Sequence, residues 1–237
     1  MSGAQAMILA AGRGERMRPL TDVCPKPLLP VGGQPLIVWH IRQLVGAGLC
    51  DIVINHAWLG ERIVTALGDG RSLGARLRYS AESPALETAG GIAHALEFFG
   101  GEPFLVVNGD IWCDWNPERA LTLATQMSTK QLAHLVLVDN PEHHPQGDFT
   151  LHANGRVAPR GPAGTALTFA GIGVYHPSLF AGIHPDQPAA LAPLLRSGMA
   201  ERVVTGEHHR GQWADIGTPQ RLTQLDRMLR KRPDASC

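Results

Sequence analysis

Apolar runs of strand length alternate with stretches of helical spacing over the first 140 residues, and this alternation constrains the fold most. The runs cover Ala6–Ala11, Asp51–His56, Ala75–Ser80, Pro103–Asn108 and Leu132–Asp139. Helical spacing follows Pro35, and it recurs over Thr88–Phe99 and Pro117–Met127. This order favours a mostly parallel mixed sheet with helices on both faces. We therefore predict an α/β fold, Rossmann-like, with three α/β/α layers and ligands at the carboxyl ends of the strands.

The pattern changes after Gly147. A hairpin is predicted around Asn154-Gly155, between strands at 148–151 and 156–158, and a longer strand at Thr168–Tyr175. Thr218-Pro219 supplies an N-cap and a first-turn proline for a closing helix. The length suits one domain, residues 1–237, with halves of about 1–140 and 141–237.

Composition excludes several classes of partner. Lysine plus arginine and aspartate plus glutamate number 21 each, so the net charge of zero disfavours nucleic acid and acidic membranes. The four cysteines, Cys24, Cys50, Cys113 and Cys237, are scattered and are expected to be reduced thiols. With no basic, apolar leader and no apolar run of about 20 residues, we expect a cytoplasmic protein without membrane contact.

A glycine-containing loop follows the first apolar run and leads to two cations. Gly12 and Gly14 can present backbone N–H groups to phosphate oxygens, because glycine carries no Cβ. Arg16 can bind two phosphate oxygens with its fork of donors, and Lys26, between two prolines, adds a point charge. The combination is typical of a nucleoside triphosphate site, although it is neither a P-loop nor a complete dinucleotide-binding fingerprint.

Asp110 follows the fourth apolar run through Asn108-Gly109, at the edge of the predicted sheet where the glycine loop also lies. An aspartate after glycine is common in turns, and it is equally placed to ligate a metal. Position alone leaves both interpretations open.

The segment from Gly12 to Thr21, followed by Pro25-Lys26-Pro27, resembles the signature of sugar-1-phosphate nucleotidylyltransferases. Similarity continues over nearly the whole chain, through residues 54–58, 86–91, 107–110, 139–141 and 213–218. The resemblance implies the nucleotide-diphospho-sugar transferase type of fold, with nucleotide in the first half and sugar phosphate in the second. It also implies that Asp110 and Asp215 together hold Mg²⁺, whose octahedral shell suits carboxylate, phosphate and water oxygens.

The resemblance assigns further residues to the two substrates. It places nucleotide contacts at Ala11, Gly12, Gly14, Arg16, Glu82, Gly90 and Gly91, and sugar-phosphate contacts at Lys26, Asn55, Asn108, Gly147 and Gly171. Arg16, Lys26 and Asp110 are expected to be catalytic. The family's frequent Glu-Lys-Pro sugar motif is absent, because Arg156 is followed by Val157-Ala158-Pro159.

The activity implied is Mg²⁺-dependent transfer of a nucleoside monophosphate from a nucleoside triphosphate to a sugar 1-phosphate. Whole-chain similarity favours UTP and N-acetylmuramate 1-phosphate, in cell-wall sugar recycling. A carboxylate at Glu82 could instead bind guanine as a fork, which would suit a guanylyltransferase acting on mannose or heptose 1-phosphate. A non-catalytic nucleotide-binding regulatory subunit and a dinucleotide-dependent oxidoreductase are further alternatives, and the sequence leaves the oligomeric state open.

Overall fold

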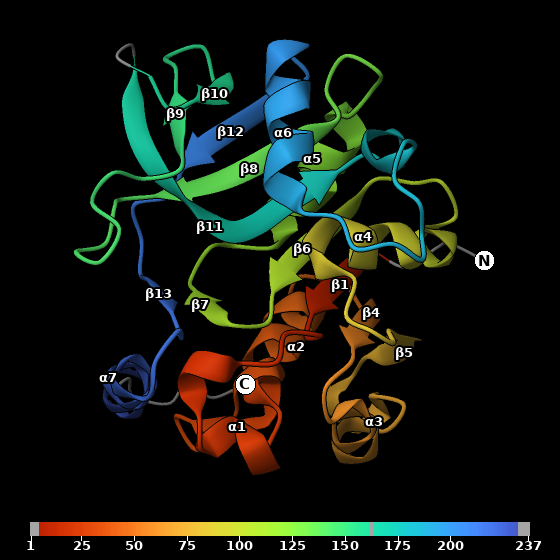
Figure 1. Cartoon of the computed structure of the whole chain (residues 1–237), viewed down its shortest axis with the longest axis vertical. Helices are drawn as coiled ribbons and strands as arrows, with labels where there is room; N and C mark the ends of the chain where they lie inside the picture. The colour runs from red at the N-terminus through yellow and green to blue at the C-terminus, as the bar shows by residue number, and fades with distance from the viewer. Residues whose placement is uncertain (1–4, 162–163, 232–237) are drawn as a thin grey trace.

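The structure is a computed structural model that describes residues 5–161 and 164–231 (Figure 1); Cys237 lies outside these ranges. The strands are β1 Ala6–Leu9, β2 Pro30–Val31, β3 Gln34–Pro35, β4 Asp51–His56, β5 Arg76–Ala81, β6 Phe104–Asn108, β7 Ile111–Cys113, β8 Ala133–Val138, β9 Phe149–Leu151, β10 Val157–Pro159, β11 Thr165–Tyr175, β12 Val204–His208 and β13 Trp213–Asp215. The α-helices are α1 Leu20–Val23, α2 Leu36–Gly46, α3 Gly60–Leu67, α4 Glu87–His94, α5 Glu118–Gln126, α6 Leu191–Ala200 and α7 Pro219–Arg230.

The main sheet confirms the predicted fold class. Strands β5, β4, β1 and β6 pair in parallel, and β11 then continues the sheet antiparallel to β6. β8 pairs with β11 and, in parallel, with β12, while the predicted hairpin β9–β10 joins the first part of β11. The sheet is therefore mixed, with a parallel block formed by the first half of the chain.

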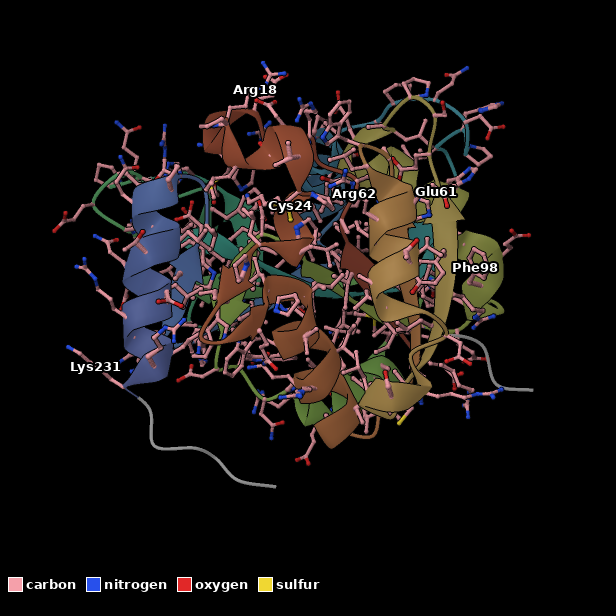
Figure 2. All side chains as sticks on the ribbon, turned by 90° about the horizontal axis from the view of Figure 1, so that it is seen from below. Arg18, Cys24, Glu61, Arg62, Phe98 and Lys231 are labelled. Atoms are coloured by element: carbon pink, nitrogen blue, oxygen red, sulfur yellow. The ribbon has the colours of Figure 1, made fainter. Side chains whose placement is uncertain are left out.

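Helices cover both faces of the sheet because the strand side chains alternate. In β1, Ala6 and Ile8 pack into the core that contains α2, α3 and α5 residues, whereas Met7 packs into the core of α4 and α6. A third, smaller core joins α7 to the segment after the glycine loop through Leu225, Leu229 and Met17. Seen from below, α7 and α3 flank α1 and α2 (Figure 2).

Two hydrogen bonds connect α7 with the β2–β3 turn and α3 with the end of α1. The Asp226 carboxylate of α7 accepts a hydrogen bond of 2.8 Å from the Gly32 N–H, between β2 and β3. Arg62 of α3 donates to the Val23 carbonyl at the end of α1 (Figure 2). Burial raises the pKa of the neighbouring Cys24 thiol, and the positive charge of Arg62 only partly offsets this rise. Within the described ranges, no helix has the length and apolar character needed to cross a membrane.

Candidate active site

A cleft of about 580 Å³ opens at the carboxyl ends of β1 and β6. The parallel register sets Leu9 beside Asn108 on one side and beside Asn55 on the other, so the loops after these strands meet at one edge. The lining comprises Leu9–Met17, Lys26, Pro27, Thr88, Asn108–Asp110 and Gly217. This is the edge at which a parallel α/β sheet is expected to bind ligands.

Gly14 is needed for the backbone conformation of the loop, whereas Gly12 borders open space. Gly14 has φ of 67°, and a Cβ there would lie 3.0 Å from Thr21 Cγ2, so the loop needs glycine at this position. Thr21 Oγ1 then donates to the Gly14 carbonyl at 2.8 Å and holds the turn. A Cβ at Gly12 would meet no atom within 4 Å, so Gly12 borders the open space of the cleft. Backbone here is accessible to an anionic ligand.

Three cations line the cleft. Arg16 is exposed, and Lys26 is buried with its Nζ 2.9 Å from Asp110 Oδ2. Arg13, which the sequence reasoning did not select, stacks its guanidinium 3.7 Å from the ring centre of Trp58 and donates to the Thr21 carbonyl at 2.9 Å. The cleft therefore carries the positive charge that a triphosphate requires.

Asp110 reaches the cleft because Gly109 allows β6 and β1 to approach closely. The Gly109 N–H donates to the Leu9 carbonyl at 2.8 Å, and a Cβ on Gly109 would lie only 2.5 Å from that oxygen. The Asp110 side chain is 48% exposed, so one face of the carboxylate remains open beside Lys26.

The backbone brings the Asp215 segment to Asp110. β13 pairs antiparallel with β7, with Asp215 opposite Ile111, and the Ile216 N–H donates to the Asp110 carbonyl at 2.8 Å. The Asp215 carboxylate forms an ion pair with Arg221, and its Oδ1 lies 3.2 Å from His143 Nε2.

This donor set fits Mg²⁺. Two carboxylates supply the hard oxygen ligands that Mg²⁺ prefers, Asp110 on the cleft lining and Asp215 on the neighbouring segment. Each is now balanced by a protein cation, Asp110 by Lys26 and Asp215 by Arg221. The two carboxylates that would hold a divalent ion are thus each paired with a protein cation in this structure.

A second cavity of about 460 Å³ adjoins the cleft and shares Thr88 and Asn108 with it. One wall is apolar and includes Phe169, Leu191 and Leu195. The remaining lining includes Asp148, whose carboxylate accepts from the Phe169 N–H at 2.9 Å. Two substrates could thus lie side by side, with Asn108 at their boundary.

Comparison with known proteins decides the family, because the family model for nucleotidyl transferases matches residues 5–232. The chain belongs to the nucleotidyl transferase family. It is 53% identical over 221 residues to the N-acetylmuramate alpha-1-phosphate uridylyltransferase of Neisseria meningitidis, covering 93% of this chain and 96% of that one. The protein of the same name from Caulobacter vibrioides is 34% identical over 91% of this chain and 92% of its own.

A solved structure agrees with the fold. The Bacillus anthracis protein provisionally assigned as a glucose-1-phosphate thymidylyltransferase, crystallised with sucrose, superposes with a TM-score of 0.83. The match covers 98% of this chain and 97% of that one at 22% identity, so it supports the architecture alone. The predicted fold class and family are thereby confirmed, and the oxidoreductase alternative receives no support from the family match.

Of the residues predicted for substrate binding, catalysis or metal binding in this nucleotidyl transferase, seven line the cleft: Ala11, Gly12, Gly14, Arg16, Lys26, Asn108 and Asp110. Asp215 stands beside the cleft, two residues before its lining residue Gly217. The structure also adds Arg13 and Thr88, which lie in the matching segments 12–21 and 86–91 but had been given no role. Thr88 follows Glu87, the first residue of α4, which has a positive φ of 58°. Thr88 lines both cavities, which only the structure reveals.

Glu82 and Asn55 lie behind the cleft rather than on its lining. Asn55 Nδ2 donates to Glu82 Oε1 at 2.6 Å, the Leu86 N–H donates to Oε2 at 2.8 Å, and Asn55 Oδ1 accepts from the Ala10 N–H. Glu82 is 6% exposed, and the pair braces the backbone that leads into the glycine loop. The base and sugar contacts expected for these residues stay predictions.

The remaining predicted glycines accommodate close packing. A Cβ on Gly91 would lie 2.4 Å from Glu82 Oε1, and one on Gly90 would lie 2.6 Å from the Gln187 carbonyl. Gly147 and Gly171 both have positive φ, of 64° and 78°. A Cβ on Gly171 would lie 2.8 Å from Asn108 Nδ2, so this glycine sets the position of the side chain shared by the two cavities.

Proposed function

We propose that this chain transfers a uridylyl group from UTP to N-acetylmuramate 1-phosphate with the help of Mg²⁺, releasing pyrophosphate and supplying UDP-N-acetylmuramate for cell-wall sugar recycling. The observation that carries the proposal is one cleft with a glycine loop, three cations and Asp110, opening into a second cavity at Asn108. The names of the two relatives supply the base and the sugar.

The triphosphate is proposed to lie against the glycine loop. The open side of Gly12 accepts phosphate oxygens on backbone N–H groups, and Arg16 neutralises the phosphates that depart as pyrophosphate. Arg13, held by Trp58 and the Thr21 carbonyl, adds charge at a fixed place.

The acceptor phosphate is proposed to approach Lys26 from the second cavity. An oxygen of the sugar phosphate forms a bond to the α-phosphorus of UTP while the bond from that phosphorus to the bridging β-phosphate oxygen breaks. The second pKa of a phosphate monoester is about 6, so the attacking group is already mostly a dianion at pH 7 and no side chain has to remove a proton. The problem for the protein is repulsion between two anions, and Lys26 reduces it.

Asp110 and Asp215 would hold Mg²⁺, which would supply positive charge to the phosphate oxygens of the donor. Lys26 and Arg221, which now balance these carboxylates, would then be available to the incoming phosphates and to the acidic sugar. The apolar wall formed by Phe169, Leu191 and Leu195 suits the methyl groups that N-acetylmuramate carries.

Two observations bear on the alternatives. The guanylyltransferase alternative needs the two carboxylate oxygens of Glu82 to accept from guanine. Both oxygens already accept hydrogen bonds within the protein, which disfavours this alternative. We place the reaction in the cytoplasm, because Cys24, Cys50 and Cys113 are free thiols.

The test is a substrate panel with pyrophosphate release as the readout, using UTP, GTP, dTTP and ATP against N-acetylmuramate, N-acetylglucosamine, glucose and mannose 1-phosphates. We expect the highest kcat/KM for UTP with N-acetylmuramate 1-phosphate. Higher kcat/KM for GTP with mannose 1-phosphate would overturn the substrate assignment, and no pyrophosphate with any pair would favour the regulatory subunit.

A further inference from the structure

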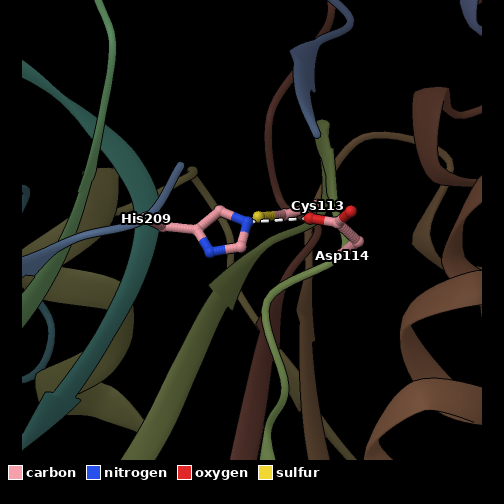
Figure 3. A group of neighbouring side chains, drawn as sticks. All are labelled: Cys113, Asp114 and His209. Carbon is pink, nitrogen blue, oxygen red and sulfur yellow. Dashed lines mark hydrogen bonds and ion pairs between the residues drawn. The ribbon is translucent and has the colours of Figure 1, made fainter. Parts of the chain in front are cut away.

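A second group of metal-ligand side chains lies outside the cleft, where the end of β7 meets the segment after β12 (Figure 3). Cys113 ends β7, Asp114 follows it, and His209 follows β12. A thiol sulfur, a carboxylate oxygen and His209 Nε2 lie within 4.8 Å of one another, and Asp114 Oδ1 is 2.8 Å from His209 Nε2. Residues 95 positions apart in the chain thus direct three donor atoms to one point.

The backbone of Gly211 packs directly against this cluster. A Cβ on Gly211 would lie 2.3 Å from Asp114 Oδ1 and 2.5 Å from His209 Nε2, so this arrangement of the cluster requires glycine at position 211. The Cys113 residue is 3% exposed, whereas the side chains of His209 and Asp114 are 17% and 32% exposed. One side of the cluster is therefore closed by the protein, and the other is open to solvent.

We infer that Cys113, Asp114 and His209 form a binding site for a thiophilic divalent cation of the Zn²⁺ class, separate from the magnesium site. Sulfur, imidazole nitrogen and carboxylate oxygen are the three ligand types that Zn²⁺ uses, and a tetrahedral ion would take water as the fourth. Mg²⁺ prefers oxygen ligands and is expected to compete poorly here.

Binding changes the protonation of the ligands. Burial raises the pKa of the Cys113 thiol to about 12, so the thiol loses its proton to solvent as the metal–sulfur bond forms. When Nε2 of the neutral His209 ring ligates the ion, the ring proton lies on Nδ1, and the hydrogen bond to Asp114 is replaced by bonds from both groups to the metal.

The site would brace the ribbon that carries the expected magnesium ligands. Cys113 lies three residues after Asp110, and β13, which ends at Asp215, begins four residues after His209. The Asp114 N–H also donates to the Gln212 carbonyl at 3.1 Å, so an ion here would tighten an existing link between β7 and the approach to β13. The role is structural, not catalytic.

The test titrates Co²⁺ into the full chain after chelator treatment, with the thiolate-to-cobalt charge-transfer absorption as the probe. We expect one equivalent of thiolate-ligated Co²⁺, displaced by Zn²⁺. Cys113→Ser should abolish the band and His209→Gln should weaken binding at least tenfold, whereas Cys50→Ser and Asp110→Asn should bind as the unmodified chain does. Zn²⁺ at 100 times its Kd should raise Tm by about 5–10 °C.

Any of three results would overturn the site: no thiolate band in the unmodified chain, a band that survives Cys113→Ser, or a band lost in Asp110→Asn. His209 is partly exposed, so His209→Gln should fold even if Cys113→Ser does not. Unchanged Co²⁺ affinity in folded His209→Gln would contradict the proposal by itself.

Discussion

Lys26 is a buried ammonium whose Nζ lies 2.9 Å from the half-exposed carboxylate of Asp110. Replacing it in Lys26→Met keeps the length of the side chain and removes the charge that is proposed to meet the acceptor phosphate. We expect kcat/KM for pyrophosphate release to fall at least 100-fold, the usual effect of removing one preorganised donor to a developing charge. The exposed Lys130 provides the matched control, and Lys130→Met should retain activity. Equal activities in the two variants would remove Lys26 from the mechanism.

Gly91 supports the brace formed by Asn55 and Glu82. In Gly91→Ala the new methyl would lie 2.4 Å from Glu82 Oε1, and the buried pair has little room to move. We expect the free energy of unfolding to fall by about 1–3 kcal/mol in urea denaturation.

Gly46 offers the comparison for that change. It is helical, and a Cβ there would meet nothing within 4 Å, so Gly46→Ala should raise the free energy of unfolding by about 0.4–1 kcal/mol. Equal effects of the two substitutions would show that the contact at Gly91 does not limit packing.

The residues of the cleft were predictable to the extent that they follow strands directly. Gly12, Gly14 and Asp110 come just after parallel strands, whose carboxyl ends must share an edge. Glu82 was not predictable in this way, because the register of β4 and β5 turns its carboxylate toward Asn55. Arg13 carried no signal of its own, since its position depends on contact with Trp58, 45 residues away.

At the scale of elements, α7 depends on its N-cap. Thr218 Oγ1 accepts from the Arg221 N–H at 3.3 Å, and Pro219 occupies the first turn, as the sequence predicted. Thr218→Ala should lower the free energy of unfolding by about 1 kcal/mol, measured by urea denaturation. Thr122→Ala, at an exposed position of α5, should change it by less than about 0.5 kcal/mol. A loss no larger in Thr218→Ala than in Thr122→Ala would contradict the role of the cap.

Glu207 links β12 to α5 and makes stability depend on pH. Burial raises the pKa of its carboxyl, but the nearby His134 imidazole, with Nε2 3.8 Å away, and hydrogen bonds from Arg119 and Trp115 outweigh burial and lower the pKa to about 2. Since this pKa is below that of the unfolded chain, the link stabilises fully above about pH 4.5, and the contribution is lost as the pH falls toward 2.

In Glu207→Gln, we therefore expect a loss of about 1–2 kcal/mol in the free energy of unfolding at pH 7, allowing for solvent screening. The difference from the unmodified chain should shrink at pH 3, in urea titrations at both values. The exposed Glu102 serves as control in Glu102→Gln, where no such convergence is expected. A deficit that is the same at both pH values would contradict the ionic origin.

The elements recovered from sequence are those with clear periodicity. The five strands predicted in the first 140 residues match β1, β4, β5, β6 and β8 within about two residues, α5 matches as closely, and α2 and α7 begin where the sequence predicted helices. β12 was missed, because Val204–His208 contains only one large apolar residue and is specified by pairing with β8. The short β7–β13 ribbon was missed because each strand has only three residues, too few to show a periodic pattern, although it brings the Asp215 segment beside that of Asp110.

At the scale of the whole molecule, β11 joins the two parts of the sheet. Its first residues pair with β9 and its last residues with β6, and its register with β8 shifts between Phe169 and Ile172. Gly171 lies at this shift and contacts Asn108, where the two cavities meet. The alternation in the first half predicted the architecture, whereas the adjacency of the cavities required this non-local pairing. The division into halves at about residue 140 stays a prediction.

A crystal structure of the chain grown with UTP and Mg²⁺ tests the account most directly, because it observes the proposed donor and the ion together. We predict the triphosphate against Gly12 and Arg16, with one Mg²⁺ ligated by Asp110 and Asp215. A triphosphate bound elsewhere, or a Mg²⁺ held by neither carboxylate, would contradict the proposal that the glycine loop, Arg16 and the two aspartates form one site for UTP and Mg²⁺.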